Sequence, residues 1–257
     1  MLTGDSRPVR RAAASLILLG VAACSDPAFA YRPFDGTDAA VAAPGELEIE
    51  LQPAGLEHEE GTQTLIAPWT VVNIGLSEGW EAVFEGRGET PLVPTGPTNL
   101  MMGGAFLKHV VVPGVLQDKS GPSIATEFGV LLPDSTGDSG VGASWAGIVS
   151  QRWDWGTAHF NVETLLTRDH HADVFVGTIL EGPIKWKVRP VAEFFYEKEF
   201  GMEETFSGLV GLIYQASDKL SFDVAFRHAL TNGHGVNEVR ARVTFAVPLR
   251  FEGAHNR

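Results

Sequence analysis

Apolar and polar residues alternate along the C-terminal third of the chain. In its last segment an apolar residue occupies every second position, and charged or small residues fall between most of them. A period of two places these two sets on opposite faces of an extended strand. The pattern therefore predicts a strand with one apolar and one largely charged face. The apolar row consists of Val239, Ala241, Val243, Phe245, Val247, Leu249 and Phe251.

The segments 184–198 and 220–229 show the same alternation. Strands of a soluble sandwich are usually about 5–6 residues long, whereas a membrane-spanning barrel needs strands of about 9–11 residues with an apolar outer face. The pattern therefore predicts a transmembrane β-barrel with apolar rows against lipid and charged rows along the lumen. The residues predicted to face lipid are Trp186, Phe194, Phe222, Phe226 and Phe245. Those predicted to line the lumen are Lys185, Lys187, Arg189, Glu193, Asp223, Arg227, Glu238, Arg240 and Arg242.

The whole region 46–251 divides into candidate strands of this kind. They are expected near 46–57, 64–76, 80–87, 100–112, 121–132, 141–152, 157–168, 172–181, 184–198, 205–216, 220–229 and 236–251. Their even number suits a bacterial single-chain barrel, so the predicted fold is all-β, a twelve-stranded, antiparallel, up-and-down barrel. The connections after odd-numbered strands are longer on the whole, which predicts loops at that end, short periplasmic turns at the other, and both termini in the periplasm. The tryptophans, mostly near strand ends, are expected at the membrane interfaces.

Residues 1–30 have the layout of a secretory signal peptide. Arginines precede the apolar run 12–23, and Ala28-Phe29-Ala30 offers a cleavage site. A competing cut lies before Cys24, in a sequence typical of a lipobox. Cleavage after Ala30 is favoured, because a barrel is already anchored by its wall. Cys24 is the only cysteine, which excludes an intramolecular disulfide.

Residues 31–45 lack strand periodicity and are expected to form a leading segment before the barrel, either in the periplasm or folded into the lumen as a plug. Residues 252–257 form a short C-terminal tail. After residue 30 no apolar run is long enough for a spanning helix. The formal net charge of −13 argues against nucleic-acid partners, which call for a basic patch.

Short motifs resemble a known family. Tyr31-Arg32-Pro33-Phe34 and the segment 44–50 look like the opening of bacterial outer-membrane barrels labelled "MetA-pathway of phenol degradation". The segment 73–81 is similar to the first tight hairpin of that family, and 122–133 resembles its mid-chain strand. The resemblance implies passage or sensing of small, hydrophobic or aromatic compounds, and it brings no catalytic residues. The chain departs from the pattern after Phe251, since such barrels often end on the aromatic residue.

The predicted inner rows carry both signs of charge, and two interpretations stay open. The charges either form a selectivity lining, in which a basic stripe on the last four strands guides an anionic solute, or pair across strands and fill a narrow bore. Further acidic residues of these rows are Glu81, Glu85, Glu127 and Glu163.

Enzymatic and metal sites are the weaker hypotheses. A barrel hydrolase needs a serine, a histidine base and an orienting polar group on neighbouring strands. The available residues, none of them in a nucleophile motif, are Ser144, Ser150, His109, His159 and Asn161. Adjacent His170 and His171 point to opposite faces of a strand, so solvated loop histidines are expected rather than a metal site.

The sequence thus predicts an outer-membrane porin-like channel or transporter for small solutes, without a cofactor. Its expected partners are outer-membrane lipids, the barrel-assembly machinery and a solute that the sequence does not identify. A closed structural or sensing barrel and an outer-membrane lipid hydrolase are the alternatives.

Overall fold

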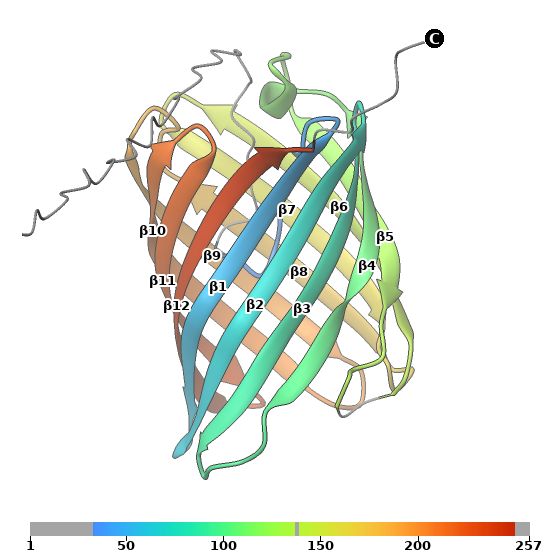
Figure 1. Cartoon of the computed structure of the whole chain (residues 1–257), viewed down its shortest axis with the longest axis vertical. Helices are drawn as coiled ribbons and strands as arrows, with labels where there is room; N and C mark the ends of the chain where they lie inside the picture. The colour runs from blue at the N-terminus through green and yellow to red at the C-terminus, as the bar shows by residue number, and fades with distance from the viewer. Residues whose placement is uncertain (1–32, 137–138, 250–257) are drawn as a thin grey trace, which may run out of the picture.

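Twelve antiparallel strands form a closed barrel in the computed structural model (Figure 1). The structure describes residues 33–136 and 139–249, so the predicted signal peptide, Cys24, Phe251 and the tail lie outside the described residues. Sequence neighbours pair as hairpins, and β1 pairs with β12 to close the barrel. The prediction of a twelve-stranded, antiparallel, up-and-down barrel is confirmed. The strands are β1 (Glu46–Glu59), β2 (Thr62–Ser77), β3 (Trp80–Val93), β4 (Asn99–Val112), β5 (Ser123–Leu131), β6 (Gly142–Trp153), β7 (Gly156–Leu166), β8 (Ala172–Glu181), β9 (Val188–Glu199), β10 (Glu204–Ser217), β11 (Leu220–Thr231) and β12 (His234–Pro248).

The two ends of the barrel differ. Glu46, at the start of β1, pairs with Pro248, at the end of β12, so both ends of the barrel chain lie at one end, called here the terminal end. A short 3-10 helix, η1 (Val115–Gln117), lies in the β4–β5 connection at this end (Figure 1, top). The opposite end, where β1 turns into β2, is called the loop end. Within the described ranges no helix has the length and apolarity needed to cross a membrane.

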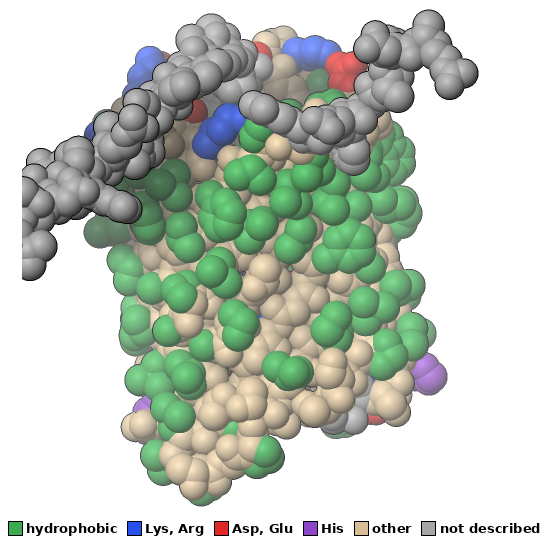
Figure 2. All heavy atoms as spheres, viewed as in Figure 1, with side chains coloured by type: hydrophobic (Ala, Val, Ile, Leu, Met, Phe, Trp, Pro, Cys, Tyr) green, Lys and Arg blue, Asp and Glu red, His purple; other side chains and the backbone are tan. Residues whose placement is uncertain are grey.

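Alternate residues of each strand face into the barrel and away from it. On β12, Arg240 and Arg242 are buried inside, whereas Val239 and Val247 of the other row are exposed. The face seen in Figure 2 is covered by hydrophobic side chains along the wall, and most of its charged side chains gather near the terminal end. The sheet therefore has a polar inner face and an apolar outer face.

Four of the five aromatic residues predicted to face lipid lie on the outer face. Phe194 is 59% exposed on β9, Phe222 and Phe226 are similarly exposed on β11, and Phe245 is partly exposed in the outer row of β12. The fifth, Trp186, does not belong to a strand.

The predicted strand 184–198 begins only at Val188. Before it, the amide of Trp186 donates to the carbonyl of Pro183 at 2.9 Å and closes a turn. Trp186, Lys185 and Lys187 therefore lie in the β8–β9 connection, where all three are exposed. The prediction that Trp186 faces lipid and that Lys185 and Lys187 line the lumen is wrong. The turn that begins at Gly182-Pro183 is longer than the sequence indicated.

The predicted difference in length between the two sets of connections is confirmed only in part. Three of the five connections at the terminal end have two residues, against two of the six at the loop end. At the loop end, Glu60-Gly61 and Asn232-Gly233 close tight hairpins, and all four residues have positive φ, the conformation of the turn type that suits the twist of paired strands. The residues expected as loops continue the ladder instead, which lengthens β1, β2 and β3 beyond their predicted bounds. Figure 1 shows these strands extending beyond the rest of the barrel at the loop end.

Two bulges change which residues face the lumen. The ladder shifts between Leu51 and Ala54 on β1, and between Ile66 and Trp69 on β2. A bulge adds a residue to one strand and so reverses the alternation beyond it. Trp69, expected at a membrane interface, instead points inward and donates its indole N–H to Glu85 at 3.0 Å. The interface prediction is wrong for this tryptophan.

The apolar outer face generates a prediction about lipid contact. Val210 on β10 and Phe200 in the β9–β10 connection are both 57% exposed, but only Val210 lies on the wall. We expect Val210→Arg to lower the free energy of unfolding in phospholipid vesicles by about 2–4 kcal/mol, the cost of an arginine near the bilayer midplane, and Phe200→Arg to change it little. Urea titration of both variants in vesicles measures the difference. Equal losses would contradict a lipid-facing wall.

Candidate functional site

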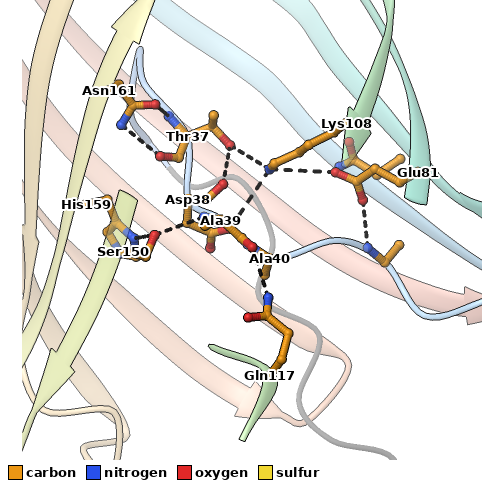
Figure 3. Close-up of polar contacts among 12 residues, drawn as sticks. Thr37, Asp38, Ala39, Ala40, Glu81, Lys108, Gln117, Ser150, His159 and Asn161 are labelled. Carbon is orange, nitrogen blue, oxygen red and sulfur yellow. Dashed lines mark hydrogen bonds and ion pairs between the residues drawn. The ribbon is translucent and has the colours of Figure 1, made fainter. Parts of the chain in front are cut away.

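Residues 33–45 run inside the barrel and are called here the plug (Figures 1 and 3). The sequence left two places open for this segment, and the structure places it in the lumen. It has no regular secondary structure, and Ala39 at its middle is fully buried. At the terminal end the amide of Gly45 donates to the carbonyl of Gly75 at 2.9 Å. The plug thus leads directly into β1.

Two apolar contacts anchor the plug. Ala39 packs with Ala125 and Ile148 on β5 and β6. Phe34 enters a cluster on the opposite wall, and burial of such a side chain contributes about 1.5–3 kcal/mol. This cluster consists of Ile179, Val191, Leu209, Ile213 and Ala225.

Wall side chains bind the plug backbone, which has no ladder to satisfy its amides. Glu193 accepts hydrogen bonds from the amides of Asp35 and Gly36, at 2.9 and 2.7 Å. Asn161 holds Thr37 from both sides: its carbonyl accepts from the Thr37 amide at 3.0 Å, and its amide group donates to the Thr37 carbonyl at 2.9 Å (Figure 3). β7 and β9 therefore fix the deep part of the plug.

A lysine on β4 links the plug to the wall beside β3. Lys108 is only 1% exposed and donates to the Thr37 hydroxyl at 3.0 Å. Its ammonium lies 3.7 Å from Glu81 and 4.0 Å from Asp38, so two carboxylates offset its burial. Glu81 in turn accepts a hydrogen bond from the Ala42 amide at 2.6 Å. Lys108 and Glu81 thus act as one unit that holds the plug (Figure 3).

Two arginines from β11 and β12 bind the first described turn of the plug. Arg240 lies 2.9 Å from Asp35 and 2.8 Å from Glu238, and it donates to the carbonyl of Pro33 at 3.0 Å. Arg227 lies 3.7 Å from Asp35 and 3.6 Å from Glu238. Burial alone would raise the pKa of Asp35, but Arg240 and then Arg227 outweigh it and hold this pKa below its ordinary value. Asp35 is therefore an anionic bridge between plug and wall.

The other two inner arginines have partners in the wall itself. Arg189 lies 3.6 Å from Glu181. Arg242 donates to Gln52 at 3.1 Å, and its guanidinium lies 4.1 Å from the Trp69 ring centroid.

Charge pairs also follow the β11–β12 ladder. Asp223 is buried and pairs in register with Arg242, as Arg227 does with Glu238. Each of the inner arginines of β9, β11 and β12 thus has an acidic or polar partner, so they do not form the free basic stripe considered from the sequence.

The residues considered for a hydrolase either lie against the plug or lie away from one another. Ser150 and His159 do meet, at 2.8 Å, and His159 lies 3.5 Å from Glu181. However, the Ser150 hydroxyl accepts a hydrogen bond from the Ala39 amide at 2.9 Å, and both side chains are buried inside the barrel. Ser150 therefore does not provide the nucleophile at the membrane boundary that the hydrolase hypothesis requires.

The remaining two candidates are not part of this cluster. His109 stacks on Trp80 with ring centroids 4.0 Å apart. Ser144 is partly buried on β6.

Several residues that hold the plug were not singled out from the sequence. Gln117 on η1 donates to the Ala39 carbonyl at 2.9 Å, and nothing in the sequence linked the two segments. The sequence did carry a signal for Lys108. It is the only Lys, Arg, Asp or Glu in the mostly apolar run Ala105–Val112.

Among the described residues, the plug leaves free space at the loop end. Beside it lies a small cavity of about 120 Å³, bordered by Phe34 and Trp69. Toward the loop end, two adjoining cavities of about 570 and 590 Å³ occupy the wider lumen. The lumen is thus accessible from the loop end and filled by the plug toward the terminal end.

The amide clamp generates a prediction about the plug. Asn161→Ala removes both hydrogen bonds to Thr37, each worth about 1 kcal/mol, so hydrogen exchange at the Thr37 amide should accelerate by about thirtyfold. Mass spectrometry of hydrogen exchange measures this. Asn237→Ala is the matched control, because the Asn237 amide group contacts His228 and not the plug. Unchanged exchange in Asn161→Ala would show that the clamp does not hold the plug.

The close approach of plug and β2 generates a second prediction. A β carbon on Gly75 would overlap the carbonyl oxygen of Ala43, whereas one on Gly208 would meet only the Phe194 ring, at 3.5 Å. We expect Gly75→Ala to displace residues 42–45 and to raise hydrogen exchange at the Gly45 amide, and Gly208→Ala to leave it unchanged. The same exchange experiment measures both, and equal exchange at Gly45 would contradict the contact.

Comparisons with known proteins concern the fold. No protein-family profile matches the chain, so the resemblance to the MetA-pathway barrels stays a prediction, and no curated protein matches it either. An outer-membrane channel from Pseudomonas putida is similar over 83% of this chain and 100% of its own, with a TM-score of 0.55 and 8% identity. The β domain of the Bordetella autotransporter BrkA is similar over 80% and 100%, with a TM-score of 0.50 and 12% identity.

A KdgM porin covers 77% of this chain and 98% of its own, with a TM-score of 0.49 and 11% identity. At such identities a likeness is one of architecture alone. The closed barrel and the two structures with TM-scores of 0.55 and 0.50 show that the chain has the fold of outer-membrane β-barrels.

Proposed function

We propose that this protein is an outer-membrane channel for small solutes and that its plug closes the channel at rest. The observation that carries the proposal is a closed barrel with an apolar outer face around an inner face of charged and polar side chains. A lipid bilayer accepts such a wall, and the enclosed polar rows suit a path for solutes. The predicted signal peptide 1–30 agrees with export to this membrane.

The plug distinguishes this proposal from a permanently closed structural barrel. It is held by side-chain hydrogen bonds, ion pairs and two small apolar contacts, and not by strand pairing with the wall. Each such hydrogen bond contributes about 0.5–1.5 kcal/mol when neutral and about 1.5–3 kcal/mol when one group is charged. None of them belongs to the ladder, so the plug can leave the lumen while the barrel stays intact. The cavities at the loop end give a solute room to approach it.

The orientation follows from the expected topology. The terminal end faces the periplasm and the loop end faces outward, so a solute enters the wider cavities first and meets the plug afterwards. Outer-membrane lipids surround the wall, and the barrel-assembly machinery inserts it. The charged inner rows favour solutes that are at least partly polar over the purely hydrophobic compounds that the family resemblance implies.

Planar-bilayer conductance tests the proposal. The double variant Asn161→Ala/Glu193→Ala removes the hydrogen bonds to Asp35, Gly36 and Thr37, and we expect it to conduct more than the native chain. The control Asn237→Ala/Glu204→Ala removes an Asn and a Glu whose side-chain partners are His228 and Lys198. It should conduct like the native chain.

Heat-dependent gel mobility verifies that each barrel is folded before the recording. If neither the native chain nor the Asn161→Ala/Glu193→Ala variant gives conductance steps, the channel proposal fails and the closed barrel takes its place.

A further inference from the structure

The two adjoining cavities at the loop end form one space, called here the acidic vestibule. They share Arg87, Glu163, Glu197 and Glu203, and their volumes of about 570 and 590 Å³ lie in the range of small-molecule sites. Most strands of the barrel contribute to its wall. Its acidic lining residues toward the loop end are Glu57, Glu59, Glu85, Glu89, Glu163, Asp169, Asp173, Glu197, Glu199 and Glu203.

The arginines at the rim of the vestibule are already bound. Arg87 lies 2.7 Å from Glu89. Arg168 donates to the carbonyls of Leu132 and Gly103 at 2.8 and 2.9 Å, and it lies 3.7 Å from Asp134. These two cations therefore neutralise little of the vestibule.

The arginines at the floor are bound as well. Arg227 and Arg240 both contact Asp35 and Glu238, as described for the plug. Their charges are matched by these two carboxylates, which line the same cavity, so they leave its other acidic residues without a matching cation.

Four carboxylates of the vestibule have no cationic partner among the described residues. No Arg, Lys or His side chain of the described chain lies within ion-pair distance of Glu57, Glu197, Glu203 or Asp173. Asp173 is the most telling, because it is only 6% exposed, lines the cavity, and has one carboxylate oxygen, Oδ1, without any hydrogen-bond partner. A buried carboxylate left unpaired is costly, so a cationic group from outside the chain would offset this cost.

The position of these groups indicates the kind of cation. Glu57 lies on β1, whereas Asp173 and Glu197 lie on β8 and β9, so the unpaired carboxylates belong to different parts of the wall. The aromatic ring of Phe175 also lines the cavity, and aromatic faces attract organic cations. The rings of Trp69 and Phe195 already have arginines of the chain over them. A molecule with more than one ammonium group suits carboxylates on different parts of the wall.

We propose that the acidic vestibule binds small organic cations with two or more ammonium groups and that these are the solutes of the channel. The second half of this proposal rests on the proposed function. The field of the unpaired carboxylates concentrates such cations at the entrance and repels anions. This is the opposite charge preference to the one that a free basic stripe would give.

Isothermal titration of the full mature chain in detergent tests the proposal with three probes of similar length. The probes are 1,4-diaminobutane with two positive charges, succinate with two negative charges, and neutral 1,4-butanediol. We expect binding of the diamine alone, weakened by added salt because the attraction is electrostatic. Absence of diamine binding, or equal binding of the diol or of succinate, would overturn the proposal without any variant.

Matched variants locate the binding site. Asp173→Asn/Glu197→Gln should weaken diamine binding by about tenfold or more, since the variant removes two negative charges that attract the ammonium groups. Glu78→Gln/Asp154→Asn removes the same charges from exposed turns at the terminal end and should leave binding unchanged. Equal affinities for both double variants would place the diamine elsewhere and overturn the proposal.

The two proposals fail separately. Diamine binding without conductance in any variant leaves the site in place and removes the channel. Conductance without diamine binding keeps the channel and removes this solute class.

Discussion

Closure of the sheet is the constraint on which the rest of the structure depends. In a bilayer core no water is present to bind backbone amides and carbonyls, so every strand needs two neighbours and no edge can remain. The pairing of β1 with β12 meets this requirement. Once the ladder is closed, the period of two sorts every side chain to lipid or lumen. The alternation seen in the sequence is a direct consequence of that sorting.

Sorting creates a second problem, because an enclosed lumen holds many charged side chains at close range. The structure solves it in two ways. Cross-strand pairs such as Asp223 with Arg242 match charges within the wall. The plug supplies the remaining groups: Asp35 meets two arginines, and backbone amides meet Glu193. The plug and the inner wall thus complete each other, while the vestibule at the loop end retains unmatched acids.

The fold could be predicted from the sequence because alternation is local, as the row from Val239 to Val247 illustrates. The errors arose where a bulge changes the inward–outward alternation or a turn moves the end of a strand. The bulge between Ile66 and Trp69 reversed the phase between the two parts of β2, and the turn after Gly182 excluded Lys185 and Lys187 from a strand. The contacts between plug and wall were harder to predict, since they join residues far apart in the chain. Gly36 and Glu193, for example, are separated by 157 positions. No pattern of spacing reports such a contact.

The attachment of the plug to β1 has a consequence for how the lumen is closed again. Residues 33–45 precede Glu46 without a linker, and the Gly45–Gly75 hydrogen bond fixes the junction. A displaced plug therefore remains tethered at the mouth of its own binding site, where its effective concentration is of millimolar order whatever the amount of protein in the membrane. Reclosure is a first-order event of the single molecule, so even weak individual contacts suffice to return it.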